Sequence, residues 1–474
     1  MNPEGKRLAQ LRTISVRGGF SPWQRASVFL ILAGLAMAAV FAPVDSAAAT
    51  VSALILLFGM IMLLKFTLSL RAGGVEPLPD QLLTDAECPS YTIVAALYKE
   101  PEVLPQLMQS LSAMDYPKER LQVLILLEED DKETRRVAQR LAIPENLEFI
   151  IIPYEEPGPR CKPRALQYAM RRLMAGDFVV IYDAEDRPDP DQIRKAATVF
   201  AQRGPELACL QAEVRWYNRE QSLMTRMAAA SYASHFGLIL PGLAKSKGVV
   251  PLGGTSCHIR TSALALIGGW DPYNVTEDLD LGVKLKRAGF CVAMLPSITW
   301  EEAPTTIKAT VKQHSRWIKG HTATFIAHTR NPFSLYRDLG AFGFLSFLLI
   351  IGGAHVAILA APIFWSMTLM YLLTGAHIIQ QITPQPAFYL GVTCLLGNFF
   401  FAWQAMFACV ITGQYRMVPW TLLLPIFWLS VLSAAGLKAA WEVISGRLYY
   451  WDKTQHGVSL KEEAKTNIIG GTAT

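Results

Sequence analysis

The chain has 474 residues, of which 51% are hydrophobic and only 18% are charged. This length exceeds one ordinary core, and the composition departs from the globular averages toward that of a membrane protein. The net charge of +5 does not indicate nucleic-acid binding, because much of the excess lies beside apolar segments, where Lys and Arg mark the cytosolic side. Seven cysteines without a CxxC pair argue against a disulfide framework or a zinc site.

Two apolar runs follow a basic N-terminus. Ala26–Val44 is too long for a typical cleavable signal peptide, and Ala47–Phe66 follows it almost at once. The pair predicts a helical hairpin with its tip at Asp45, and Arg71 then returns the chain to the inside. We therefore expect residues 1–72 to form a cytosolic N-terminus and two transmembrane helices.

The pattern changes at Tyr91 to short apolar runs that alternate with helix-like stretches. This alternation predicts βαβ units and a doubly wound sheet in a cytosolic domain over residues 73–337. Ligands bind such sheets beyond the carboxyl ends of the strands. The expected strands are Thr92–Leu97, Gln122–Leu127, Leu147–Ile152, Phe178–Tyr182 and Leu207–Gln211, and the expected helices are Glu102–Ala113, Lys132–Leu141, Pro163–Met174 and Asp191–Gln202.

Met227–Ala244 is free of charge and resembles a membrane span in composition. A single crossing there would place the sequence motifs before and after it on opposite faces of the membrane. We therefore expect an interfacial helix, with a span as the alternative.

The C-terminal third, residues 338–440, is apolar. Ala341–Thr374 is broken by Gly352, Gly353 and Pro362, and it fits one long kinked helix, a span plus an interfacial helix, or a tight pair. Further spans are expected at Ala387–Ile411 and Val418–Leu437. Lys438, Arg447 and Lys453 favour a cytosolic tail over residues 441–474, which requires an even number of crossings. Six crossings are favoured and four are the alternative.

An acidic motif, Asp183-Ala184-Glu185-Asp186, directly follows the fourth expected strand. Adjacent carboxylates repel one another unless a cation compensates them. Hard divalent cations prefer such oxygen ligands and also hold substrate phosphates, so the motif predicts a metal–diphosphate site. The alternative is a helix N-cap.

The second motif is Thr276-Glu277-Asp278, at the start of an amphipathic stretch. A carboxylate in a pocket can deprotonate an attacking hydroxyl, although a helix cap would use the same residues.

The third motif is Gln313-His314-Ser315-Arg316-Trp317. Trp317 offers a flat face to a sugar ring and Arg316 can pair with phosphate oxygens. The alternative is a basic amphipathic helix on anionic lipid.

In this order and spacing, the three motifs resemble the family 2 glycosyltransferases of the membrane-integrated processive branch, which includes the cellulose, β-glucan, chitin, hyaluronan and poly-N-acetylglucosamine synthases. The combination of TED with QxxRW is specific to that branch, and the resemblance covers nearly the whole chain. It implies an α/β GT-A catalytic domain, Rossmann-like and cytosolic, embedded in an α-helical transmembrane protein.

The resemblance implies roles for residues that match the family's motifs. Asp278 takes the place of the general base, beside Glu277. Asp183 with Glu185 or Asp186 would bind Mg²⁺ or Mn²⁺, and this chain has Glu185 where many relatives have Asp. The implied donor-binding residues are Tyr98, Glu100, Asp130, Lys162, Asp183, Gln313 and Arg316, and the implied acceptor-side residues are Trp317, Gly254, Thr255 and Ser256.

The resemblance further implies an inverting enzyme of the bacterial inner membrane that polymerises a β-linked exopolysaccharide and secretes it. UDP-glucose is the favoured donor and UDP-N-acetylglucosamine the next, because the tail Trp451–Gly457 is similar to one in bacterial relatives of β-glucan synthases. The expected partners are the UDP-sugar, a growing glycan or lipid acceptor, membrane lipid, and export proteins of the periplasm or outer membrane, but no nucleic acid. The alternatives are single transfer to a lipid, and a degenerate receptor or scaffold.

Overall fold

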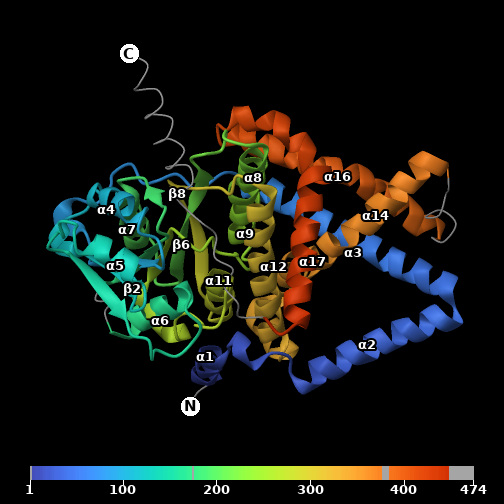
Figure 1. The fold of residues 1–474 in the computed structure, drawn as a ribbon, viewed down its shortest axis with the longest axis horizontal. Coiled ribbons are helices and arrows are strands. Elements are labelled where there is room, and N and C mark those ends of the chain that lie inside the picture. Colours follow the sequence, from blue (N-terminus) through green and yellow to red (C-terminus); the bar gives the residue numbers. More distant parts are fainter. Residues whose placement is uncertain (1–2, 173–175, 376–383, 448–474) are drawn as a thin grey trace.

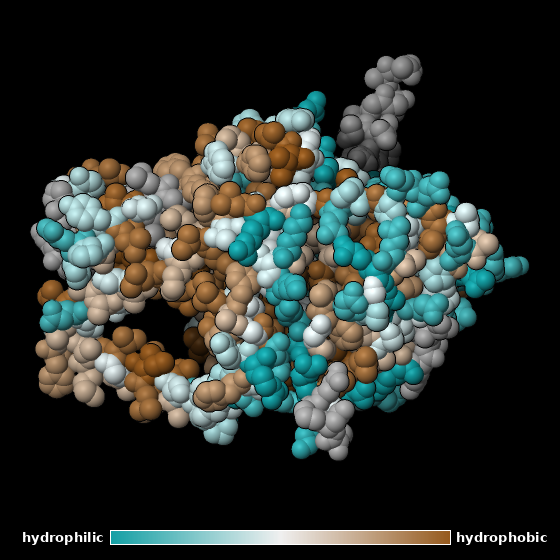
Figure 2. Space-filling view, turned by 180° about the vertical axis from the view of Figure 1, so that it is seen from behind, coloured by the Kyte–Doolittle hydropathy of each residue, from teal (hydrophilic) through white to brown (hydrophobic). Residues whose placement is uncertain are grey.

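The computed structural model describes residues 3–172, 176–375 and 384–447, so the tail Trp451–Gly457 lies outside the described residues. Figure 1 shows a domain built on one twisted sheet, beside an array of long helices that extends away from it. In Figure 2, hydrophilic side chains dominate the surface of the sheet domain and apolar side chains that of the helical array.

The sheet has eight strands in the order β3-β2-β1-β4-β7-β6-β8-β5. β1 to β4 are parallel, whereas β7 is antiparallel to both β4 and β6. The strands are β1 (Tyr91–Leu97), β2 (Leu121–Glu128), β3 (Leu147–Ile152), β4 (Phe178–Tyr182), β5 (Arg187–Pro188), β6 (Leu207–Trp216), β7 (Cys257–Arg260) and β8 (Cys291–Glu301).

Helices cover both faces of the sheet because successive strand residues point to opposite sides. Ile93 packs in a core with α4 and α7, and the neighbouring Val94 packs in a second core with α6, α10 and α11. The helices of the domain are α4 (Leu104–Ser112), α5 (Lys132–Ala138), α6 (Lys162–Arg172), α7 (Gln192–Gln202), α10 (Thr261–Ile267), α11 (Glu277–Arg287) and α12 (Ile307–Thr329), with short turns η2 (Asp85–Glu87) and η3 (Lys118–Arg120).

The predicted α/β GT-A fold class is confirmed, with one change in the sheet. The stretch Leu207–Gln211 was predicted to continue the parallel run, but β7 lies between β4 and β6. β7 has only four residues, two of them polar, and its apolar pattern is too short to indicate a strand.

The N-terminal hairpin consists of α2 (Pro22–Phe41) and α3 (Pro43–Ala72), preceded by α1 (Pro3–Thr13) and η1 (Val16–Gly18). Its tip is at Ala42 and not at the predicted Asp45, because Pro43 begins a new helix and places Asp45 in the first turn of α3. Nearly all of α2 is exposed, although its side chains are apolar.

The segment Ala341–Thr374 belongs to one long kinked helix, the first of the three alternatives. α13 (Pro332–Phe347), η5 (Leu348–Gly353) and α14 (Ala354–Thr374) follow one another without a loop. The helix departs from regular geometry at Gly340, where φ is 69°, and in the π-helical turn that ends at Gly353.

Among the described residues, four helical stretches are long and apolar enough to cross a membrane: Pro22–Phe41, Pro43–Ala72, Pro332–Thr374 and Tyr415–Ile444. The last comprises η6 (Tyr415–Leu423), η7 (Leu424–Trp428) and α17 (Leu429–Ile444). Before it comes the apolar helix α16 (Gln385–Ile411). The number of crossings stays a prediction.

The stretch Met227–Ala244 is part of a continuous helix made of α8 (Leu223–Ser234), η4 (His235–Ile239) and α9 (Leu240–Lys245). It is absent from the candidate spans of the described residues, and it packs between the sheet core and helices α3 and α16. At Gly242 it meets α3 so closely that a Cβ atom would lie 2.3 Å from the carbonyl oxygen of Leu68. The helix that packs on the sheet core and the candidate membrane span α3 therefore share a backbone-to-backbone contact.

We expect Gly242→Ala to lower stability by about 1–3 kcal/mol, because neither backbone can yield without moving its helix. Thermal unfolding in detergent measures this. The matched control is Gly34→Ala in α2, where no atom lies within 4 Å of the added Cβ and alanine favours the helix. Equal stability of Gly242→Ala and the wild type would contradict the close contact.

Candidate active site

One cavity lies at the carboxyl ends of β1, β2 and β4, as expected for an α/β sheet. α11 and α12 close its other side. The predicted residues that line it are Tyr98, Glu100, Lys162, Asp183, Glu185, Gly254, Glu277, Asp278, Gln313, Arg316 and Trp317. Residues from all three motifs, far apart in sequence, thus face one space.

Asp183 and Glu185 present their carboxyl groups at the end of β4. The ammonium of Lys162, the first residue of α6, contacts the Asp183 carboxylate and donates to the carbonyl oxygen of Gly254 at 2.8 Å. Burial lowers the pKa of Lys162, but Asp183 and Glu277 outweigh this effect and leave the pKa raised. Lys162 is therefore a permanent cation beside the acidic motif.

Of the two alternatives for the second metal ligand, Glu185 lines the cavity and Asp186 does not. Asp186 is fully buried, and its Oδ2 accepts from the backbone N–H of Asp183 at 2.6 Å and from the Thr255 hydroxyl. Burial and the neighbouring Asp183 and Glu185 raise the pKa of Asp186 well above its ordinary value. The carboxylates of the motif that line the cavity are those of Asp183 and of Glu185, which is only 7% exposed.

The predicted acceptor residues Thr255 and Ser256 are also fully buried. The Thr255 hydroxyl donates to Asp186, and the Ser256 hydroxyl donates to that of Thr299 at 2.5 Å. We therefore assign their side chains to the support of the loop, whose glycines Gly253 and Gly254 line the cavity. Ser256 has a φ of 53°, so the loop holds strained backbone next to the site.

Glu277 and Asp278 occupy the first turn of α11, where the helix dipole favours negative charge. Burial nevertheless raises the pKa of both carboxyl groups, that of Asp278 to about 6. Gly254 lies against Asp278: a Cβ atom at Gly254, whose φ is 82°, would be 3.1 Å from Oδ2 of Asp278. The close approach leaves one carboxylate oxygen of Asp278 beside the glycine loop.

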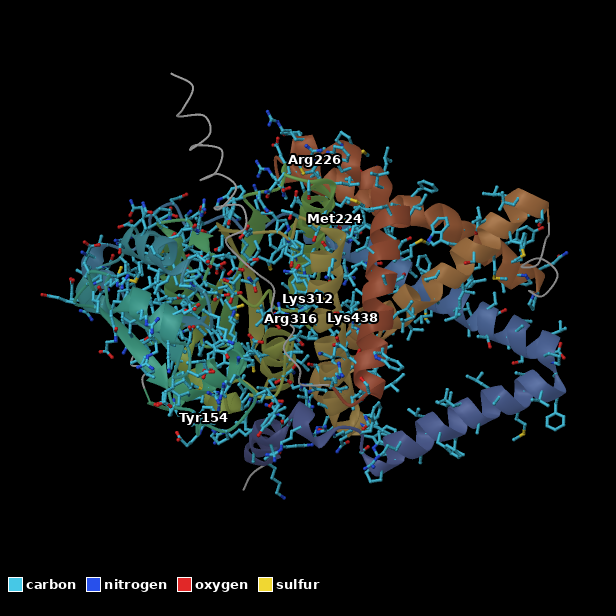
Figure 3. All side chains as sticks on the ribbon, viewed as in Figure 1. Tyr154, Met224, Arg226, Lys312, Arg316 and Lys438 are labelled. Atoms are coloured by element: carbon cyan, nitrogen blue, oxygen red, sulfur yellow. The ribbon has the colours of Figure 1, made fainter. Side chains whose placement is uncertain are left out.

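Helix α12 brings Gln313, Arg316 and Trp317 to the cavity, and Figure 3 shows Arg316 on this helix beside the sheet domain. Burial lowers the pKa of Arg316, whereas acidic groups, Asp183 and Glu277 foremost among them, oppose this effect. The guanidinium therefore faces the same acidic residues as Lys162. The Trp317 ring lies 6.4 Å from that of Tyr232, which also lines the cavity.

A buried polar network fixes α11 against α12 and α13. Arg287 Nη1 lies 3.1 Å from His328 Nδ1, and His328 Nε2 lies 2.7 Å from Asp280 Oδ1. Because arginine only donates, Nδ1 of His328 accepts, and Nε2 carries the proton that is donated to Asp280. Arg287 also pairs with Asp338 of α13 at 2.9 Å. The helix that carries Asp278 is thereby joined to the helix that carries Arg316.

The β1 end of the cavity holds Tyr98, whose hydroxyl donates to Asp130 at 3.2 Å. Asp130 also pairs with Arg160 at 2.5 Å and does not itself line the cavity, whereas Arg160 does. Lys99, with a φ of 57°, is held by a hydrogen bond from its N–H to Asp131. This strained turn sets the direction of Tyr98 and Glu100.

Sequence reasoning missed the polar lining residues Arg160, Tyr232 and Glu301. Glu301 ends β8, and burial raises its pKa well above the ordinary value. Its signal was the doublet Glu301-Glu302 after an apolar run, the pattern that singled out Asp183. No comparable signal marks Tyr232 within its apolar helix.

Residues 89–320 match the family model described as "Glycosyltransferase like family 2". The chain is 25% identical over 278 residues to "Probable glycosyltransferase YdaM" of Bacillus subtilis (strain 168), covering 56% of this chain and 64% of the relative. It is 27% identical over 246 residues to "Glucomannan 4-beta-mannosyltransferase 7" of Arabidopsis thaliana, covering 50% of this chain and 44% of the relative. The chain thus spans less than two thirds of the length of these curated relatives.

Among solved structures, the fold resembles "Mannosyltransferase PcManGT from Pyrobaculum calidifontis in complex with GDP-Man and Mn2+". The TM-score is 0.50, and the likeness covers 84% of this chain and 99% of that one at 18% identity. At this identity the comparison concerns the fold alone.

A buried ion pair supports the segment with Arg160 and Lys162, where α6 begins. Arg164 Nη2 lies 2.5 Å from Glu128 Oε2, and its Nη1 donates to the carbonyl oxygen of Glu156. We expect Arg164→Met to lower stability by about 3–5 kcal/mol in thermal unfolding, because Glu128 would be left buried and unpaired. The control is Arg203→Met, which breaks the pair with Glu76, whose two side chains are 49% and 58% exposed, and it should cost less than about 1 kcal/mol. Equal losses in the two variants would contradict a special role for the buried pair.

Proposed function

We propose that this glycosyltransferase transfers a hexose, with inversion, from a nucleoside-diphosphate sugar to a β-linked glycan that grows at the membrane. One observation carries the proposal: Asp183, Glu185, Asp278 and Arg316 face the same cavity. The catalytic domain lies beside helices that are long and apolar enough to cross a membrane, which supports a membrane-bound acceptor.

The donor's diphosphate is assigned to the space between Asp183, Glu185 and the cations Lys162 and Arg316. In the described parts of the chain, no group of three His, Cys, Asp or Glu side chains is arranged to hold a metal ion. Mg²⁺ is usually bound by one or two carboxylates together with substrate phosphates, so the carboxylates of Asp183 and Glu185 fit the ion. The solved structure of PcManGT, which holds GDP-Man together with Mn2+, supports this assignment. The bound metal would stabilise negative charge on the leaving diphosphate.

Asp278 is proposed as the general base. As the acceptor hydroxyl oxygen bonds to the anomeric carbon, the bond from that carbon to the diphosphate oxygen breaks, and the hydroxyl proton moves to the Asp278 carboxylate. The leaving diphosphate needs no protonation, since Lys162, Arg316 and the metal would compensate its charge. Attack from the side opposite the leaving group inverts the anomeric centre, so an α-linked donor gives a β-linked product.

Trp317 and Tyr232 are proposed to bind the acceptor sugar, because two neighbouring aromatic faces suit the apolar face of a pyranose ring. The names of the glucomannan 4-beta-mannosyltransferase relatives support a β-linked polysaccharide as product. UDP-glucose is the favoured donor from the tail resemblance, and the mannosyl relatives make GDP-mannose its main rival. Single transfer to a lipid is the second candidate, supported by the same membrane helices.

The test is turnover of the purified full chain in nanodiscs with Mg²⁺ or Mn²⁺, using UDP-glucose, UDP-N-acetylglucosamine and GDP-mannose, with the product sized. We expect one donor to give a polymer and Asp278→Asn to lower kcat by about 10²- to 10⁴-fold, because the proton acceptor is lost. A singly glycosylated lipid as sole product would replace polymerisation by lipid transfer. Undiminished turnover by Asp278→Asn would contradict its role as base.

The activity should fall in acid, since only the ionised form of Asp278 accepts a proton. Burial raises the pKa of Asp278 to about 6. We therefore expect kcat/KM to fall about tenfold per pH unit below that value and to level off above it, measured between about pH 5 and 8. As a control, Asp130→Asn should keep the acid limb, because Asp130 does not line the cavity. A profile that is flat across this range would contradict the assignment.

A further inference from the structure

Helix α12 has two faces with different neighbours. Arg316 and Gly320, four residues apart, lie on the side of the cavity and α11. Ser315 and Lys319, also four residues apart, lie on the side of α17. Residues at this spacing share one face of a helix. The contacts of α17 with Ser315 and Lys319 therefore hold α12 in the same turn of the helix that carries Arg316.

An ion cluster joins α17 to this second face. Lys319 is 0% exposed, and its Nζ lies 2.7 Å from Glu442 Oε2 and 3.3 Å from the carbonyl oxygen of Arg447. The other carboxylate oxygen of Glu442 contacts the ammonium of Lys438, which donates to the Ser315 hydroxyl at 3.1 Å. The Ser315 hydroxyl in turn donates to the backbone of α12. Figure 3 shows Lys438 on α17 next to Lys312 and Arg316 of α12.

The opposite face of α12 leaves no room for adjustment. A Cβ atom at Gly320 would lie 2.5 Å from the side chain of Thr276, the first residue of the TED motif. α12 is thus confined between Thr276 on the cavity side and Glu442 on the other. A slide or rotation that loosened the contact with α17 would also turn Arg316 relative to Asp278.

We propose that Glu442 and Lys319 are positioning residues for the transfer reaction. Their ion pair holds α12 at the rotation and height at which Arg316 meets the donor's diphosphate. Because Glu442 belongs to the apolar stretch Tyr415–Ile444, the pair makes the C-terminal helix part of the active site's support. This inference rests on the proposed function, since it assumes that Arg316 contacts the donor.

The chemistry of the pair distinguishes positioning from mere packing. A buried ion pair adds little net stability over apolar residues of the same size, whereas removing one partner leaves an uncompensated charge. If the pair only fills space, Lys319→Met with Glu442→Leu should therefore do no harm, since Lys438, which also loses Glu442, has a side chain that is 33% exposed to solvent. If the pair sets the direction of Arg316, the same replacement should lower activity, because apolar side chains fix neither the rotation of α12 about its axis nor its position along that axis.

The experiment measures kcat and donor KM of the full chain in nanodiscs, with thermal unfolding of each variant. We expect Glu442→Gln, and also the stably folded double variant Lys319→Met/Glu442→Leu, to lower kcat/KM for the donor by about 10- to 100-fold. Glu442→Asp should restore part of the loss. Glu220→Gln, which breaks the exposed pair with Arg416, is the matched control and should leave both constants unchanged.

A double-mutant cycle with Arg316→Ala completes the test. If Glu442 acts through Arg316, Glu442→Gln causes no further loss once Arg316 is removed. Losses that multiply, or wild-type kinetics in the stable double variant, would overturn the positioning role while leaving the proposed function intact. A wild-type rate for Arg316→Ala alone would instead overturn the assignment of the diphosphate to Arg316, and this inference with it.

Discussion

The repulsion among carboxyl groups gathered around one cavity is the constraint on which the rest of the structure depends. β4, α11 and β8 each end or begin there with acidic side chains, and burial raises the pKa of Glu277, Asp278 and Glu301. Such a group is stable only if cations are built into the same walls. Lys162 at the start of α6 and Arg316 on α12 supply them.

Helix α12 links this charge balance to the helices that are long and apolar enough to cross a membrane. It contacts α11 through His328, α17 through Lys319, and the start of α2 through Gln24, whose amide donates to the carbonyl oxygen of Ile326 at 3.0 Å. Figure 1 shows α12 and α17 side by side between the sheet domain and the outer helices. A helix packed on so many sides holds its side chains in one orientation, as the proposed alignment of a donor and an acceptor would require.

Sequence periodicity was sufficient for the parallel strands and their helices, because buried strands and amphipathic helices leave long, regular patterns. The common edge of these strands then placed Tyr98, Lys162 and Asp183 together. The direction in which a single side chain points could not be predicted from these patterns. Asp186 turns inward and Asp183 outward within one short motif, and that difference depends on the backbone of a loop and on Thr255, distant in sequence. The strand β7 and the turn at Pro43 were also missed, because each is too short to leave a periodic pattern in the sequence.

The most direct test of the central claim, that bound metal and cations together compensate the carboxylates and the donor's diphosphate, is nucleotide binding by calorimetry. We predict that UDP or GDP binds the full chain about tenfold tighter, or more, in Mn²⁺ than in chelator, a difference of about 1.4 kcal/mol. This gain should disappear in Asp183→Asn. Equal affinity with and without the metal, or an undiminished gain in Asp183→Asn, would contradict the account.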